Sequence, residues 1–468
     1  MKKRELAKAV PSSWLEMEEH RLNAKPYFSG AVEAKLALEH FECEALLSLA
    51  ERGKRGIFNG PRFGRVFVSD SDHGLKLISG TDMVQNDISH TDMIAKWQAK
   101  SMPEMVLREG TTLISSYGTI GRCVYTRADM VGQIGSDNVL KIIPDISKIK
   151  PGYLYSFLSS NFGIPLVIKG EGGSVVTYLD PSRVHSIPVP RLGRIEDQAH
   201  ELVQNAADLR VEAINLLKTA GQMVNQQFGF PEKLALSHRV FSCSTASSTQ
   251  VLKRLEATFH DAVAQESDRL IAGVPRKDEF STLGIAISET GRLKQVFVDE
   301  EYGAPFLTSG EIFRMRYEPT RFLSNRLLPD ESEWATQEGD LLLARSGQVG
   351  GIIGRGVWAD RRFAGGCVSV DVLRLSAQNS QILPGYLYAY LFLTDVGYRQ
   401  LIRTAAGSSI PHLSAPDVSR LLIPRCDNAL EAEINELVWN AGHKRAEAQE
   451  KEDQARTLVE RTIEEGGR

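Results

Sequence analysis

The sequence predicts a mixed α/β (α+β) protein made of two copies of one domain, with a long helix after each copy. Two observations carry this prediction. Three blocks, G-T-T-L-I-S-S-Y-G-T-I-G, P-G-Y-L-Y and V-H-S-I-P-V-P-R, lie between residues 110 and 191, and their counterparts follow in the same order between 339 and 425. A helical hydrophobic pattern follows each copy. Because a solenoid unit has only about 20–50 residues, this repeat is a duplicated domain.

The composition is that of an ordinary globular protein, with 42% hydrophobic and 24% charged residues among 468. The formal net charge of −4 argues against an extensive basic coat for nucleic acid, but it is compatible with local basic patches. The five cysteines form no C-x-x-C pair, which favours a reducing compartment over a disulfide framework or a zinc module. No stretch reaches the roughly 18 apolar residues of a membrane span, so the expected location is the cytoplasm.

Each half is expected to open with a helix, over residues 33–52 and 251–271, because apolar residues recur there at roughly helical spacing. A basic loop rich in glycine and proline follows in the first half. Short apolar runs bounded by turn residues then predict equivalent strands in both halves. These strands are residues 65–68 with 295–298, 77–80 with 306–309, and 112–115 with 341–344.

The glycines after the last of these strands are expected to form tight turns. Gly118 and Gly121 in the first copy align with Gly347 and Gly350 in the second, and the return strands are expected to start at residues 124 and 352. The second copy approaches the dinucleotide motif G-x-G-x-x-G without matching it, and no P-loop lysine follows. We therefore interpret these glycines as turn residues rather than as a phosphate cradle.

The P-G-Y-L-Y block predicts a helix in each copy. Pro151 and Pro384 are its expected first residues, because proline suits the first helical turn. Each copy then closes on a short strand that ends at Pro190 or Pro424. The same framework is thus expected twice.

Long helices with a heptad-like apolar seam are predicted after each copy. A helix of about 30 residues is roughly 45 Å long, and it needs a packing partner to be stable in water. We expect the two helices to pack antiparallel on each other as a spacer between the domains. The alternative is that each helix folds back on its own domain. The positions predicted for the spacer seam and for partner binding are Leu202, Leu209, Leu216, Ile434, Leu437 and Leu458.

The repeat divides the chain into four parts. The first domain covers residues 1–192, the central spacer helix 193–232, the second domain 233–426 and the C-terminal spacer helix 427–468. A pseudo-two-fold internal repeat of this kind requires that both domains share one topology. Serine and threonine are frequent between 234 and 250, which favours a linker into the second domain.

The sequence shows no catalytic or metal-binding constellation. Its histidines have no metal-ligand spacing, and no serine lies in a G-x-S-x-G elbow. The nearest approach to an amino-methyltransferase motif is Asp180-Pro181-Ser182-Arg183, which does not match one. We therefore expect a binding protein without a catalytic centre, a metal or a cofactor of its own.

Basic residues with polar neighbours gather in the segments predicted as loops. Arginine can form bidentate hydrogen bonds to guanine in the major groove, and it also binds phosphates. For any single residue a solvated surface charge is the simpler interpretation, whereas the whole set favours a nucleic-acid-binding face. The candidate DNA-binding residues are Arg55, Arg62, Tyr117, Thr119, Arg122, Lys169, Arg316, Arg345, Ser346, Gln348, Arg355, Arg361 and Arg362.

Together these motifs resemble the specificity subunit of type I restriction-modification systems, or a closely similar specificity subunit of a methylation-based phage-defence system. The resemblance covers most of residues 60–465. It rests on the glycine-rich block, the P-G-Y-L-Y helix and the closing proline strand, all present twice in the same order, and on the long helix after each copy.

The resemblance implies two target-recognition domains, each reading one half of a split double-stranded DNA site, with coiled-coil-like helices that set the spacing. It implies a non-catalytic subunit that docks two DNA methyltransferase (modification) subunits, which bring S-adenosylmethionine and the catalytic residues. A restriction/translocase subunit is an optional further partner, and no membrane is involved. A competing interpretation is a scaffold protein that assembles an enzyme complex without touching DNA.

Overall fold

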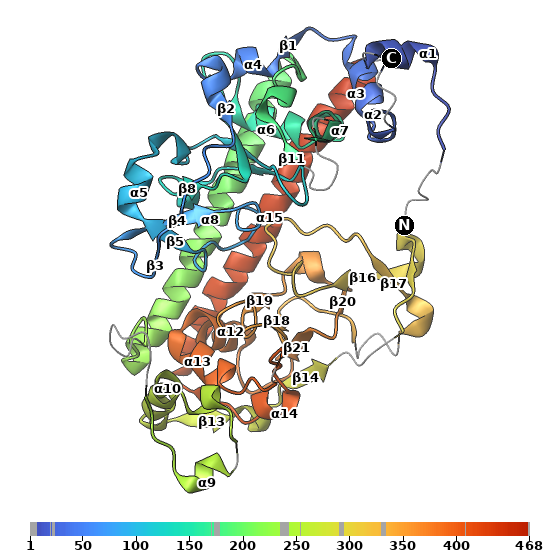
Figure 1. Ribbon diagram of the computed structural model, residues 1–468. Coiled ribbons are helices and arrows are strands. Elements are labelled where there is room, and N and C mark those ends of the chain that lie inside the picture. The colour runs from blue at the N-terminus through green and yellow to red at the C-terminus, as the bar shows by residue number, and fades with distance from the viewer. Residues whose placement is uncertain are drawn as a thin grey trace. The chain divides into compact units, whose positions relative to one another are not determined.

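The computed structural model describes residues 7–18, 20, 24–169, 171–172, 178–234, 243–252, 254–289, 294–328, 334–407 and 409–466 (Figure 1). The chain forms two compact units. The first-repeat unit comprises Arg4–Val211 and Glu447–Arg468, and the second-repeat unit comprises Glu212–Ala446. Each unit therefore contains one copy of the repeat and one half of each long helix.

The described residues of the first-repeat unit form two four-stranded sheets, which we call the β6 sheet (order β2-β9-β6-β7) and the β4 sheet (order β3-β5-β4-β8). Two short pairs, β1-β12 and β10-β11, complete the strands. The strands are β1 (Cys43–Ala45), β2 (Ile57–Phe58), β3 (Phe67–Val68), β4 (Gly74–Ile78), β5 (Met93–Ala95), β6 (Thr112–Ser115), β7 (Cys123–Tyr125), β8 (Ile134–Gly135), β9 (Val139–Ile142), β10 (Glu171–Gly172), β11 (Tyr178–Leu179) and β12 (Pro188–Pro190). The helices are α1 (Ser12–Met17), α2 (Lys25–Phe28), α3 (Ala31–Leu38), α4 (Leu46–Leu49), α5 (Lys96–Lys100), α6 (Pro151–Leu158) and α7 (Gly163–Lys169), with 3-10 turns η1 (Gly53–Gly56), η2 (Pro103–Met105), η3 (Ala128–Met130) and η4 (Pro181–Val184).

The second-repeat unit has the same strand orders in its described residues: the β18 sheet (β14-β21-β18-β19), the β16 sheet (β15-β17-β16-β20) and the pair β13-β22. The strands are β13 (Lys277–Glu279), β14 (Ala286–Glu289), β15 (Phe297–Val298), β16 (Gly303–Leu307), β17 (Phe322–Ser324), β18 (Leu341–Ala344), β19 (Gly356–Trp358), β20 (Cys367–Val368), β21 (Val372–Ser376) and β22 (Leu422–Pro424). The helices are α9 (Ser248–Val251), α10 (Ala262–Ala272), α12 (Pro384–Leu393), α13 (Asp395–Ile402) and α14 (Ala415–Val418), with 3-10 turns η5 (Ala257–His260), η6 (Phe280–Thr282), η7 (Glu300–Tyr302), η8 (Asn325–Leu327) and η9 (Arg361–Phe363).

The strand registers also repeat. Thr112 faces Tyr125 on one side and Ile142 on the other, and Leu341 faces Trp358 and Leu375 in the same way. The pairs β4-β8 and β16-β20 are parallel, while the neighbouring pairs β4-β5 and β16-β17 are antiparallel. The duplicated sequence therefore encodes one mixed α/β topology twice, as predicted.

Two of the framework expectations are confirmed in both copies. Strands β6 and β18 have the predicted bounds, and α6 and α12 begin at Pro151 and Pro384. The hydroxyl of Tyr153 donates to the Pro190 carbonyl, and that of Tyr386 donates to the Pro424 carbonyl over 2.6 Å. The P-G-Y-L-Y helix and the closing proline strand thus recur together because each tyrosine binds the end of that strand.

The opening helices are shorter than predicted. In the first copy the helix ends at Leu38, and β1 then pairs Cys43 with Pro190 of the closing strand. In the second copy α10 starts only at Ala262, and the Leu255 side chain is 81% exposed. In the first copy, pairing with the closing strand stabilises an extended backbone, so a tertiary contact overrides the helical spacing.

The alignment of the glycine-rich turns was wrong. Gly121 N donates to the Ser115 carbonyl, and Gly354 N donates to the Ala344 carbonyl. Gly121 therefore corresponds to Gly354 and not to Gly350, and β19 starts at residue 356 rather than at 352. The second turn has extra residues, which a comparison of short glycine motifs places at either end of the turn equally well.

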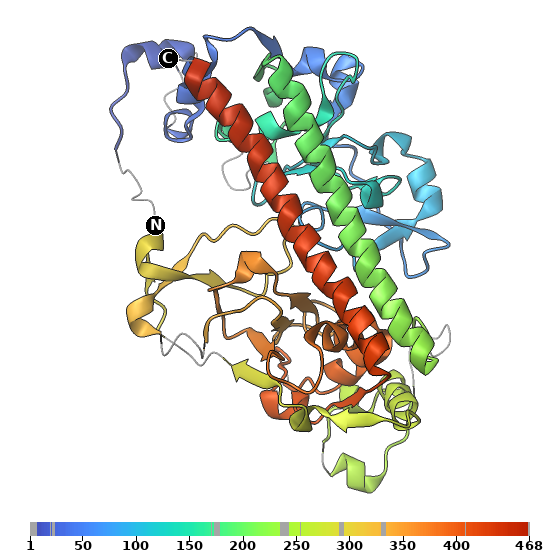
Figure 2. The ribbon, with the colours of Figure 1, turned by 180° about the vertical axis from the view of Figure 1, so that it is seen from behind.

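The long helices are α8 (Arg194–Phe228) and α15 (Asn428–Gly466), each continuous in Figure 2. In the first-repeat unit Ala199 and Val203 of α8 share a core with Ala455 and Val459 of α15 and with the β6 sheet. The second-repeat unit has a matching core that includes Ala213 and Ile434. Within each unit the helix halves therefore pack both on each other and on the domain, which combines the two predicted arrangements.

The predicted seam is displaced by one residue at most positions. Ile434 is fully buried, but Leu202, Leu209, Leu216, Leu437 and Leu458 are only partly buried. Their neighbours are buried instead: Val203, Arg210, Leu217, Val438 and Val459. Because each helix packs against both a helix and a domain, its apolar stripe is wider than a coiled-coil seam. In the described part of the chain, no helix is long and apolar enough to cross a membrane.

Candidate nucleic-acid interface

A short bridge at the end of the central strand is the feature that the two repeats share at their loop tips. Leu179 N donates to the Ser116 carbonyl over 2.9 Å, and Leu413 N donates to the Arg345 carbonyl over the same distance. Immediately beside these bonds, Tyr117 faces Tyr178 across an isolated antiparallel bridge, and Ser346 faces His412. Each repeat thus holds two side chains from distant segments at one equivalent place. We call these two pairs the bridge pairs.

In the first repeat the bridge pair is aromatic. The rings of Tyr117 and Tyr178 are near parallel, with centroids 6.2 Å apart and planes inclined by 22°. The exposed Arg62 donates from Nη2 to the Tyr117 hydroxyl over 3.4 Å. Tyr178 remains 39% exposed. Thr119 is exposed at the tip of the same turn, where its carbonyl accepts a hydrogen bond from the Ser115 hydroxyl. Three predicted site residues therefore lie together here.

In the second repeat the bridge pair is polar. Ser346 Oγ and His412 Nδ1 lie 2.7 Å apart in a hydrogen bond. Gln348 is exposed in the adjoining turn, and its carbonyl accepts a hydrogen bond from Gly351 N over 2.9 Å. Val349 is also exposed in that turn. The predicted residues Ser346 and Gln348 are thus accessible at the loop tip.

Arg345, predicted to contact DNA, supports this loop from inside. Its Nε donates to the Leu413 carbonyl over 2.9 Å, its Nη1 lies 3.4 Å from the Val370 carbonyl, and its Nη2 lies 3.4 Å from Glu289 Oε2. In the first repeat the equivalent residue is Ser116, and Ser116 together with Asn59 holds the corresponding carbonyl of Leu179. Ser116 Oγ donates to Asn59 Oδ1, whose amide nitrogen donates to the Leu179 carbonyl.

Lys169 is also engaged within the protein. Its ammonium contacts the buried Glu18 carboxylate, with 2.6 Å to Oε1, and Lys35 donates to the same oxygen over 2.9 Å. Burial lowers the pKa of Lys169 to about 8. Burial by itself would raise the pKa of Glu18, but the hydrogen bonds from the two lysines hold it below its usual value. Lys169 therefore ties the N-terminal segment to α7.

Arg362 lies in a second internal ion pair. Its guanidinium donates to both oxygens of the buried Asp360 over 2.8 Å and to the Met315 carbonyl over 2.9 Å. The first repeat has the same contact with the acidic and basic residues in the opposite order along the chain, since Arg127 donates to both oxygens of Asp129 over 2.9 Å. These pairs hold the start of η9 and η3 in place. Arg362 thus acts in the scaffold, contrary to its predicted place on the binding face.

The remaining predicted arginines of the two domains differ in their exposure. Arg122 and Arg355 are half-buried at equivalent positions, where their carbonyls accept hydrogen bonds from Ser115 and Ala344. Arg316 forms an ion pair with Glu318. Arg361 is exposed at the first position of η9.

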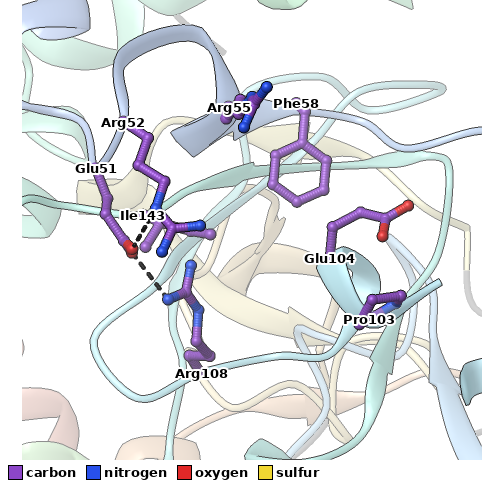
Figure 3. Close-up of a pocket in the computed structure, with 8 residues that line it drawn as sticks. All are labelled: Glu51, Arg52, Arg55, Phe58, Pro103, Glu104, Arg108 and Ile143. Carbon is purple, nitrogen blue, oxygen red and sulfur yellow. Dashed lines mark ion pairs between the residues drawn. The ribbon is translucent and has the colours of Figure 1, made fainter.

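Arg55 lines a pocket of about 650 Å³ in the first-repeat unit (Figure 3). Arg52 and Arg108 also line the pocket, and both form ion pairs with Glu51, at 3.6 and 2.8 Å. Phe58, Pro103, Glu104 and Ile143 complete the lining. The three arginines outnumber the two glutamates, so the pocket favours an anionic group.

A buried basic side chain occupies the same strand position in the β6 sheet and in the β18 sheet. Lys141 in β9 donates to the Asn59 carbonyl over 2.8 Å and to the Ser136 carbonyl over 2.5 Å. Arg374 occupies the equivalent place in β21, where it donates to the Ala335 carbonyl and lies 3.3 Å from Asp340. Burial lowers the pKa of Lys141 to about 7. Both cations bind backbone carbonyls of a neighbouring loop and are scaffold residues.

Among the described residues, no group of three or more histidine, cysteine, aspartate or glutamate side chains is placed to hold a metal ion. The residues that sequence reasoning missed are Tyr178 and His412. Both precede a buried leucine just before the closing strand, in T-Y-L-D-P and P-H-L-S-A. Aligning those leucines would have identified Tyr178 and His412 as equivalent residues, although not their partners Tyr117 and Ser346.

No protein-family model matches the sequence, and no curated protein is similar to it. Several solved structures are similar to this chain, and three of them are from type I restriction-modification systems. A type I restriction-modification S subunit from M. genitalium is 11% identical, with 90% of this chain and 95% of that chain covered and a TM-score of 0.33. An HsdS subunit from Thermoanaerobacter tengcongensis is 12% identical, with 91% and 96% covered and a TM-score of 0.26. A structure titled for complex assembly and conformational transition of the type I restriction-modification system is 14% identical, with 92% and 97% covered and a TM-score of 0.27.

Proposed function

We propose that the protein is the sequence-specific DNA-recognition subunit of a multisubunit methyltransferase or restriction complex, and that each repeat reads one half of a bipartite double-stranded site. The observation that carries the proposal is one scaffold present twice with different side chains at the same loop tip. Tyr117 and Tyr178 in one repeat correspond to Ser346 and His412 in the other. A duplicated catalytic domain would need its reacting groups in at least one copy, whereas two readers of different sequences need a common frame and divergent tips.

The chain then acts without catalysis of its own, and its partners supply the chemistry. Two methyltransferase subunits would bring S-adenosylmethionine, with a restriction/translocase subunit as an optional addition. The long helices would set the distance between half-sites and present docking surfaces. This part of the proposal is supported by the lengths of α8 and α15, 35 and 39 residues, and by the sequence resemblance described above.

The first test is methylated-base sequencing of DNA from cells that carry the gene with its methyltransferase gene. A split motif with two short half-sites across a fixed gap is the expected result. A continuous motif would show that one repeat reads bases and the other does not. In parallel, the affinity of the purified complex for its site should fall steeply as salt rises, because bound phosphates release counterions.

A scaffold that does not touch DNA is the second candidate. It is favoured by the net charge of −4 and by the internal ion pairs of Lys169 and Arg362, which remove two cations from the predicted face. An active methyltransferase complex that leaves no modified motif, and whose assembly tolerates high salt, would select the scaffold over the DNA reader.

The spacer role has its own test. Seven residues inserted in α8 and seven in α15 at facing positions should keep both apolar stripes in register and change the gap in the recognised site by a few base pairs. A rise of about 1.5 Å per residue makes seven residues about 10 Å, and DNA rises about 3.4 Å per base pair. An unchanged gap would show that the helices do not set the spacing.

A further inference from the structure

We infer that the two bridge pairs determine which bases each repeat prefers: Tyr117 with Tyr178 for one half-site, and Ser346 with His412 for the other. The inference rests on the proposed DNA-reading function and names the residues that give each repeat its specificity. Tyr178 and His412 enter the site only through the fold, because each is more than 60 residues beyond its partner in the chain.

The backbone under both pairs is the same. The amide of Leu179 or Leu413 donates to the carbonyl of the residue that precedes Tyr117 or Ser346, so each partner is fixed against the end of the central strand. Residues that face each other across an antiparallel bridge have their Cβ atoms about 4.5–5.5 Å apart, with both side chains on one face. A change of side chains here alters the groups that are presented and leaves the frame in place.

The frame is also held by different means in the two repeats, which shows that its geometry matters more than its chemistry. Ser116 and Asn59 fix the Leu179 carbonyl in the first repeat. In the second repeat Arg345 alone reaches the equivalent carbonyl of Leu413. Different residues therefore maintain the same backbone geometry in both repeats, as is expected if the two loops present different side chains from one common position.

The aromatic pair offers apolar ring surface with a guanidinium at its edge. Ring faces and edges suit apolar contact with the thymine methyl group, and an arginine suits the O6 and N7 acceptors of guanine. Tyr178 is exposed and Arg62 is anchored to the Tyr117 hydroxyl, so the three side chains form a semi-rigid surface. The first repeat therefore favours a half-site in which a guanine and a thymine are neighbours.

The serine–histidine pair offers only hydrogen-bonding groups. A hydroxyl and an imidazole can each donate or accept, and their 2.7 Å hydrogen bond orients both. Such groups read base edges through the donor and acceptor pattern of the major groove and have little apolar surface for a methyl group. The second repeat therefore discriminates by hydrogen bonds, and its preference is insensitive to removal of thymine methyl groups.

The experiment transplants the pairs within the complete complex. Tyr117→Ser with Tyr178→His gives the first repeat the second pair, and Ser346→Tyr with His412→Tyr makes the reverse change. Each complex, assembled with its methyltransferase subunits, selects from a library in which both half-sites are randomised, and a second library carries uracil in place of thymine. Phe67→Ala, an exposed aromatic residue of the β4 sheet in the first-repeat unit, is the matched control.

The expected result is a change of about tenfold in base preference at one or two positions of the altered half-site, with the other half-site and the Phe67→Ala control unchanged. In the uracil library, the wild-type complex should select the first half-site less strongly, whereas its selection of the second half-site should not change. A uniform loss of affinity without a change in preference, or unchanged preference in folded complexes, would overturn the inference.

Two controls keep the result interpretable. If thermal unfolding shows that a transplanted complex is not folded, the single change Tyr178→His at its exposed position tests the same claim. The reverse transplant in the other unit does so as well. A wild-type complex that selects no bipartite sequence would instead refute the proposed function. The two failures are therefore distinguishable.

Discussion

Gly385 N donates a hydrogen bond to Asn435 Oδ1 over 2.9 Å, at the point where the start of α12 meets the side of α15. The first repeat has the same contact, since Gly152 N donates to His200 Nδ1 over 3.1 Å. These amides belong to the first turn of a helix, where they have no partner within it. The glycine of P-G-Y-L-Y therefore joins each domain to a long helix.

Gly385→Ala should destabilise the second-repeat unit by about 1–3 kcal/mol, because inserting a methyl group into a packed contact forces a backbone shift. A Cβ at this position would lie 2.8 Å from the Cα and the carbonyl oxygen of Asn435. Chemical denaturation of the full chain measures the effect. Gly310→Ala in the same unit is the control, since a Cβ there meets nothing within 4 Å. Equal stability of the two variants would contradict the close approach.

Acid should weaken the first repeat through His200. Its Nδ1 accepts the Gly152 hydrogen bond and must be unprotonated, and its pKa is lowered first by burial and then by Lys150. The unfolded chain then binds the proton more readily than the folded one, so the stabilisation is complete above a pH of about 6.5 and is lost as the pH falls below it.

The measurement is the free energy of unfolding between pH 5 and pH 8 for the wild type and for His200→Asn, which copies the residue of the second repeat. The variant should show a smaller loss at acid pH. His40→Asn, at an exposed position of the same unit, should follow the wild type. Parallel curves for the wild type and His200→Asn would mean that His200 does not titrate with folding.

The buried ion pair between Arg210 and Glu452 fixes how α8 and α15 pack in the first-repeat unit. Both side chains are less than 5% exposed, and the two hydrogen bonds measure 2.6 and 2.9 Å. Arg210→Ala or Glu452→Ala alone should cost about 3–5 kcal/mol, because each leaves an unpaired buried charge. Arg210→Met with Glu452→Leu should restore most of this stability. A double-mutant cycle measures the coupling, and additive losses would show that the two groups do not interact.

Arg345→Ala should destabilise the second-repeat unit by about 1–3 kcal/mol, because the Leu413 carbonyl then loses its donor. Arg345→Lys should rescue it poorly, since an ammonium cannot replace the fork that reaches two carbonyls and Glu289. Arg361→Ala is the comparison at an exposed position of the same unit, and it should weaken DNA binding without a loss of stability. Thermal unfolding combined with competition by each half-site separates these effects, and equal losses at both half-sites would contradict two independent readers.

The sequence predicted the repeated framework well because that framework depends on local signals. Proline at a helix start, short apolar runs between glycines and the i, i+3, i+4 pattern of α8 can each be recognised from neighbouring residues. The extra residues of the second turn misled the alignment of Gly121, since a glycine motif of four residues fits at more than one place. The opening helix was overextended because nothing near Cys43 reveals that Pro190 pairs with it.

By itself the sequence determined that one α/β domain occurs twice, where its central strands and P-G-Y-L-Y helices lie, and that a long helix follows each copy. Only the tertiary structure decided which charges are free. Arg345, Arg362 and Lys169 were all predicted at a binding face, but a carbonyl or carboxylate from a distant segment engages each of them: Leu413 for Arg345, Met315 for Arg362 and Glu18 for Lys169. The tertiary structure also brought Tyr178 to Tyr117 and His412 to Ser346. Periodicity reports the environment of a residue along its own helix or strand, whereas partners more than 60 residues away are set by the packing of the whole domain.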